Sequence, residues 1–219
     1  MKTTKLHQKK ILLEFPTRKE LTLHFFRIAE FFESDDDAIR GKKFPIDHFL
    51  DTYSDEKGNI DYFSFWEGFN IPMQSFFEFI SVHGNDLTDR EKEIRDAVVG
   101  VIDDDGYIIG IEEGDEAVFR HEEAHELWWA NEEYRREAEK IISQISPVVR
   151  KEIEKSLTKR HYGREVMLSE INAYLSAWDE SDKEDIFPEI DDSLLEETRN
   201  KLADVFKKYK TPAVEMGLK

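Results

Sequence analysis

One segment, residues 116–142, constrains the fold of this chain more than any other part of the sequence. It contains neither Pro nor Gly, the two residues that most strongly disfavour the interior of a helix. Val118, Leu127 and Trp128 give the segment apolar side chains for packing contacts. We therefore expect one long helix over these residues.

The sequence around this segment indicates an α+β protein, with a small N-terminal and central sheet and a mainly helical C-terminal half. Short apolar runs bounded by turn residues predict strands, at residues 11–15, 60–66, 98–102 and 107–111, with a loop around Pro72. Capping-box patterns, in which Thr is followed three residues later by Glu, predict helices that begin after Thr17 and Thr88. Amphipathic spacing predicts further helices, at residues 148–160, 165–178 and 191–210.

The charge of the chain narrows the range of partners. It carries 49 Asp and Glu residues against 31 Lys and Arg residues, which gives a formal net charge of −18. Such a charge repels nucleic acid phosphates and anionic lipid headgroups. No stretch approaches the roughly 18 consecutive apolar residues of a membrane-spanning helix. We therefore expect no nucleic acid partner and no membrane partner, with the cytoplasm as the location. No sequence feature points to a particular oligomeric state.

A pair of histidines in the central segment suggests a metal site. The chain has no Cys, so a transition-metal site must use His and carboxylate ligands. His121 and His125 are four residues apart, so on a helix they lie on one face and can bind one ion at about 2.0–2.1 Å each. Glu122 follows the first histidine and is placed to take a proton from a water molecule, as in an H-E-x-x-H motif.

A catalytic zinc site needs a third protein ligand besides the two histidines. Glu170 is the best candidate. It lies 45 residues after His125 (170 − 125 = 45) on a predicted helix. Ala173 and Ala177 share its helical face, and side chains this small allow two helices to approach closely.

Further residues are candidates for this site. His161, at a predicted helix break, is an alternative third ligand or a group that stabilises the transition state. Tyr174, or alternatively Tyr134, would polarise a substrate carbonyl, or else serve as a half-buried packing residue.

The segments "HEEAH" and "EINAY" resemble the zincin metallopeptidases, specifically the gluzincin branch, over about residues 107–178. The resemblance implies a zinc cofactor, a zincin-like fold and hydrolysis of peptide bonds in a peptide or protein substrate. It makes His121, His125 and Glu170 the metal ligands and Glu122 the general base.

The chain departs from the family pattern at two positions of the motif helix. Glu123 and Glu126 stand where zincins usually have uncharged residues. The extra negative charge would favour cationic substrates. Two other readings therefore stay open: a non-catalytic, zincin-like metal-binding protein, and an acidic interaction protein without metal, such as a mimic of DNA.

The sequence also suggests how the chain is divided into domains. We expect a single domain over residues 1–219, since 39% of the residues are hydrophobic and 16 are Phe. Within it, residues 1–100 would form a mixed α/β accessory part, 101–180 the zincin-like metal-site core, and 181–210 the C-terminal helix.

Overall fold

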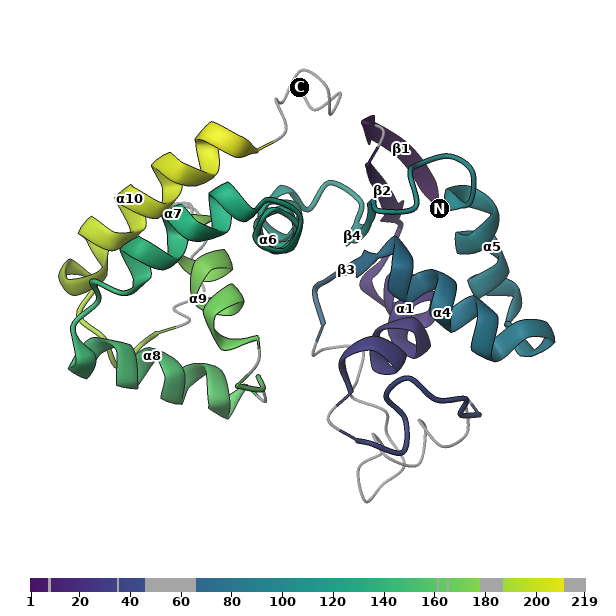
Figure 1. Cartoon of the computed structure of the whole chain (residues 1–219), viewed down its shortest axis with the longest axis horizontal. Coiled ribbons are helices and arrows are strands. Elements are labelled where there is room, and N and C mark those ends of the chain that lie inside the picture. Colours follow the sequence, from purple (N-terminus) through teal and green to yellow (C-terminus); the bar gives the residue numbers. More distant parts are fainter. Residues whose placement is uncertain are drawn as a thin grey trace. The chain divides into compact units, whose positions relative to one another are not determined.

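A computed structural model describes residues 1–7, 9–34, 36–45, 66–160, 162–164, 166–177 and 187–210. It confirms the α+β class, with a small sheet in the N-terminal part and helices over the rest (Figure 1). The contacts within the chain divide it into two compact units, Met1–Val118 and Phe119–Pro212. This division lies inside the motif helix, whereas the sequence suggested subdivisions at 100 and 180 of one domain. The single-domain organisation stays a prediction.

The first unit is built on a mixed sheet of four strands in the order β1-β2-β4-β3. The strands are β1 (Lys2–His7), β2 (Lys10–Phe15), β3 (Gly68–Pro72) and β4 (Tyr107–Glu112). The two central strands run parallel, with Ile11 opposite Ile108, and each edge strand is antiparallel to its neighbour. Parallel neighbours need a long crossover connection, and the helices of this unit lie in that connection.

The helices of the first unit are α1 (Arg18–Glu33), α4 (Met73–His83) and α5 (Asp89–Val98). Two of them, α1 and α4, pack on this sheet, and α5 packs on α1. Helix α1 contacts β2, β3 and β4 as well as α4 and α5. The capping box of Thr88 and Glu91 is confirmed at the start of α5. Glu91 also receives a buried hydrogen bond from Arg27 Nε at 2.7 Å, which ties α5 to α1.

Gly110, in β4, lies where side chains of α1 approach the sheet closely. A Cβ atom added there would lie 2.5 and 2.8 Å from two ring carbons of Phe25 and 3.1 Å from Leu21 Cδ1. The Phe25 ring is itself held, because it stacks on Phe69 with 5.1 Å between ring centroids. We expect Gly110→Ala to lower the free energy of unfolding by about 1–3 kcal/mol through overpacking. Urea denaturation measures this, and an unchanged midpoint would contradict it.

Two expectations about the strands are wrong. Residues 98–102 form the end of α5 and a turn instead of a strand, because Val98 is buried as part of the apolar face of that helix. The loop expected around Pro72 contains β3, where Pro is tolerated because β3 is an edge strand. The sequence also did not predict β1. Residues 60–65 of the strand expected at 60–66 lie outside the described part of the chain.

The second unit is helical in its described part. Helix α6 (Glu116–Ala130) crosses into it from the first unit. It is followed by α7 (Glu132–Ile142), α8 (Pro147–Lys159), α9 (Met167–Ser176) and α10 (Ser193–Tyr209). Helix α9 contacts α7, α8 and α10. The three helices expected after residue 147 are thus confirmed.

The single helix expected over 116–142 is instead two helices. Asn131 interrupts it with an extended backbone (φ −124°, ψ 99°), and its side chain accepts a hydrogen bond from the backbone N–H of Tyr134. An Asn side chain can compete with the helix for backbone donors and begin a new helix. Pro and Gly are therefore not the only residues that end a helix.

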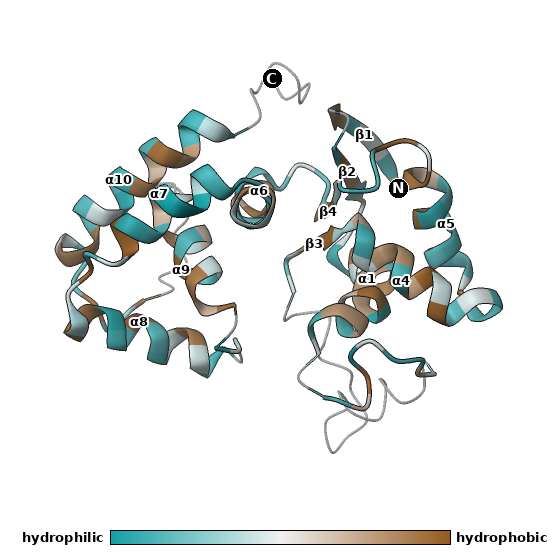
Figure 2. Cartoon of the chain, in the orientation of Figure 1, coloured by the Kyte–Doolittle hydropathy of each residue, from teal (hydrophilic) through white to brown (hydrophobic). Residues whose placement is uncertain are grey.

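The second unit has its own apolar core. Its buried residues come from all of its helices and include Trp128, Tyr134, Ile171 and Leu202. Figure 2 shows that α10 carries both hydrophobic and hydrophilic residues along its length. Among the described residues, no helix has the length and apolar character needed to cross a membrane.

Candidate metal centre

The two histidines of the motif lie side by side on α6. Their ring centroids are 4.8 Å apart, and the two Nε2 atoms are separated by 3.1 Å. His125 is buried, whereas the His121 side chain is 20% exposed. The helical spacing predicted from sequence therefore brings the two Nε2 atoms together.

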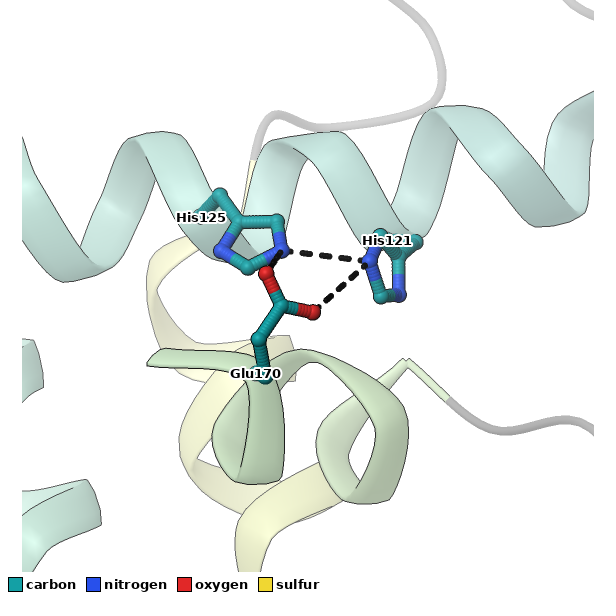
Figure 3. Close-up of side chains that lie close together, drawn as sticks. All are labelled: His121, His125 and Glu170. Atoms are coloured by element: carbon teal, nitrogen blue, oxygen red, sulfur yellow. Dashed lines mark hydrogen bonds and ion pairs between the residues drawn. The ribbon is translucent and has the colours of Figure 1, made fainter. Parts of the chain in front are cut away.

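Glu170 approaches both histidines from α9, as Figure 3 shows. Its Oε1 atom lies 3.4 Å from Nε2 of His125, and its Oε2 atom lies 3.8 Å from Nε2 of His121. Each carboxylate oxygen thus faces a different imidazole.

Side-chain interactions and buried small residues mark the contact between α9 and α6. Ala124 on α6 and Ala173 on α9 are both fully buried in the core of this unit. Asn172 Nδ2 donates a hydrogen bond to the backbone carbonyl of Ala124 at 3.4 Å. Ala173 and Ala177 are thus both buried, and their expected role in letting two helices approach closely stays a prediction.

The three side chains lie close enough together to hold one metal ion. One ligand atom from each of His121, His125 and Glu170 can be chosen so that all lie within 4.8 Å of one another. Ligand atoms at about 2.0–2.1 Å from a tetrahedral ion are about 3.3 Å apart. The two Nε2 atoms, 3.1 Å apart, and Oε1 of Glu170, 3.4 Å from Nε2 of His125, are near this spacing, whereas the 3.8 Å contact to His121 is made by the other carboxylate oxygen, Oε2. Oε2 of Glu170 is buried without a hydrogen-bond partner, and a cation would provide the missing interaction.

The electrostatics of the three side chains also favour a bound cation. Burial lowers the pKa of His121, and a charge on His125 would lower it further. Burial also lowers the pKa of His125 and raises the pKa of Glu170. Neutral imidazoles are the form that binds metal. A positive ion would also offset the desolvation of the carboxylate.

Glu122 lies next to the cluster. It is buried, and its negative charge opposes the lowering of the His125 pKa by burial. The same charge contributes to the raised pKa of Tyr162 and Tyr174, after burial and Glu170. Its carboxylate is therefore within electrostatic reach of the proposed ligands, as a general base would be.

The two extra carboxylates of the motif helix are placed differently from what the sequence suggested. Glu123 and Glu126 are both buried, and their charges act on Tyr134, whose pKa is raised mainly by burial. Tyr134 donates a hydrogen bond to Asn172 inside the helical core. These two carboxylates therefore contribute to the interior of the second unit.

Tyr174, predicted as a candidate residue, does reach the cluster. Its ring centroid lies 4.5 Å from that of His121. Its hydroxyl is 2.8 Å from the hydroxyl of Tyr162, in the segment before α9. Burial and the charge of Glu170 raise the pKa of both phenols. Both hydroxyls are therefore protonated at neutral pH. His161 lies outside the described residues, so its predicted role stays untested.

Sequence reasoning missed two residues of the site. Ser169 Oγ lies 2.7 Å from Nδ1 of His125, and both side chains are buried. The Tyr162 hydroxyl contacts the hydroxyl of Tyr174, and the charge of Glu170 acts on it. Ser169 carries one sequence signal, its position directly before Glu170. Tyr162 carries none, because its contact depends on the path of the chain between α8 and α9.

Comparisons with known proteins leave the chain without an assigned family. No protein-family model matches it, and neither curated proteins nor solved structures give a match. The resemblance to zincins therefore rests on the residues of the motif and on the His-His-Glu cluster, which occurs in other classes of metal site as well.

Proposed function

We propose that this chain is a zinc-dependent hydrolase and that its substrate is a peptide or protein. The observation that carries the proposal is the His121–His125–Glu170 cluster, in which one ligand atom of each residue lies within 4.8 Å of the other two, beside the buried Glu122. Two imidazoles and a carboxylate are a ligand set used by catalytic zinc.

The number of ligands favours a catalytic site over a purely structural one. Structural zinc sites are usually closed by four protein ligands, whereas catalytic sites have three and leave one position open. Within the described residues, the cluster consists of three candidate ligands. The partly exposed side chain of His121 gives the cluster a side that is not fully covered by protein.

Each residue has a distinct role in the proposed reaction. Zinc at this site would polarise a substrate carbonyl and lower the pKa of a water molecule towards about 7. Glu122 accepts a proton from the attacking water and passes it to the leaving amine. Tyr174, with its protonated hydroxyl, donates a hydrogen bond to the carbonyl oxygen as negative charge develops.

Metal content and peptide hydrolysis test the proposal together. Protein purified without a metal-binding tag is analysed by elemental mass spectrometry and incubated with a peptide library that includes basic sequences. We expect about one zinc per chain and cleavage that stops when a chelator is added. A chain that takes up no zinc, even when zinc is supplied, would rule out the metal site.

Tyr174→Phe tests the role of the tyrosine hydroxyl. The variant keeps the ring that contacts His121, so we expect it to bind zinc normally. Loss of one hydrogen bond to the developing oxyanion typically lowers kcat by about 10²–10³-fold. Tyr162→Phe is the matched control, because it removes only the partner of that hydroxyl, and a smaller loss is expected. Full activity in Tyr174→Phe would exclude the assignment.

A further inference from the structure

We propose that Ser169 is a positioning residue of the metal site, which holds the imidazole of His125 with Nε2 directed at the ion. The proposal rests on the proposed function, because it concerns the same cluster. It follows from the 2.7 Å contact between Ser169 Oγ and His125 Nδ1, on the opposite side of the ring from Nε2.

The argument begins with the protonation state of a histidine that binds metal. A neutral imidazole has one N–H group and one lone pair. When Nε2 of His125 gives its lone pair to an ion, the hydrogen must be on Nδ1. That N–H group is then buried, since the residue is 6% exposed. A buried donor without a partner is unfavourable, and Ser169 Oγ is placed to accept its hydrogen bond.

The position of Ser169 in the chain links two ligands of the site. It directly precedes Glu170 on α9, and it bonds a histidine on α6. One short helical segment therefore fixes the carboxylate ligand and the ring of His125 together. Ser169 is 2% exposed, so water cannot easily take its place.

Zinc affinity of Ser169→Ala is the first test. Affinity is measured by competition between the protein and a zinc-binding dye, with zinc chloride as the only added metal. Loss of an outer hydrogen-bond partner typically weakens metal binding by about 10–100-fold, and we expect that loss here. Ser176→Ala is the matched control, because Ser176 is a buried serine on the same helix whose hydroxyl contacts Tyr134 instead. We expect it to bind zinc as the unchanged protein does.

NMR of the zinc-loaded protein provides a second, independent measurement. In protein labelled with ¹⁵N at histidine, we expect the Nδ1–H signal of His125 to be protected from exchange with water. The protection should be lost in Ser169→Ala, kept in Ser176→Ala and restored in Ser169→Thr, which returns a hydroxyl. A purely structural role of Ser169 would not move this signal.

The outcomes separate failure of this inference from failure of the proposed function. If the unchanged protein binds zinc and Ser169→Ala binds it equally tightly with the Nδ1–H signal intact, Ser169 is not a positioning residue and the metal site still stands. If the unchanged protein binds no zinc, the proposed function and this inference are both wrong. If Ser169→Thr does not fold, the comparison of the two alanine variants still decides the question.

Discussion

Replacing His125 with Ala is expected to abolish stoichiometric zinc binding and the stability that zinc adds. The wild-type chain should gain about 2.7 kcal/mol in free energy of unfolding when free zinc is 100 times its dissociation constant. The variant should gain almost nothing, because only two of the three ligands remain. Thermal denaturation with zinc chloride, and again after addition of a chelator, measures both values.

His24→Ala is the control for this experiment. His24 is another buried histidine on a helix, but it belongs to the first unit, where its ring bonds the backbone carbonyl of Glu20 and the side chain of Glu93. We expect the variant to be less stable than the wild-type chain and yet to keep the zinc-dependent gain. A gain that survives in His125→Ala would place the metal elsewhere in the chain.

Replacing Glu122 with Gln is expected to separate metal binding from catalysis. The amide has nearly the same size as the carboxylate but cannot accept the proton of the attacking water. General base catalysis contributes about 10²–10⁴-fold to the rate, so we expect kcat to fall by that factor. Zinc content should stay at the wild-type value, since Glu122 is not one of the three clustered ligands. Cleavage of a peptide substrate and elemental analysis of the same sample measure the two quantities.

Glu123→Gln is the matched control, because it makes the same chemical change one residue along the helix. Glu123 acts on Tyr134 in the helical core, so this variant should alter stability and leave cleavage within a few-fold of wild type. Wild-type activity in Glu122→Gln would exclude Glu122 as the base. Loss of zinc from Glu122→Gln would show that this residue supports the metal site itself.

Together the two experiments distinguish the three readings of the sequence. An active peptidase binds zinc and depends on Glu122. A non-catalytic metal protein binds zinc, loses stability when zinc is removed, and cleaves no peptide. An acidic interaction protein without metal is unaffected by chelators, and His125→Ala then changes none of these properties beyond a local effect on stability.

The sequence by itself determined the features that depend on neighbours in the chain. The four-residue spacing of His121 and His125 places both on one helical face, because an α-helix completes a turn in about 3.6 residues. The capping box at Thr88 and Glu91 and the helices of the C-terminal half follow from equally local patterns. The absence of Cys fixed which ligand types were available.

Local patterns predict the wrong element where a competing interaction decides the structure. The apolar run at 98–102 was predicted to be a strand, but burial of Val98 on a helix face determined its conformation. The segment 116–142 was predicted to be one helix, but the side chain of Asn131 begins a second one. In both places the local sequence also fits the predicted element. The environment of one side chain, Val98 or Asn131, stabilises a different element.

Only the tertiary structure decided which distant residues meet at the site. The sequence pointed to Glu170 as the best candidate for the third ligand, with His161 as an alternative, and side-chain packing between α9 and α6 brought Glu170 to within 3.4 Å of His125. The same packing placed Ser169 behind the ring of His125, and the chain path before α9 placed Tyr162 beside Tyr174. Such contacts depend on how segments far apart in the chain pack together, and no periodicity within either segment encodes them.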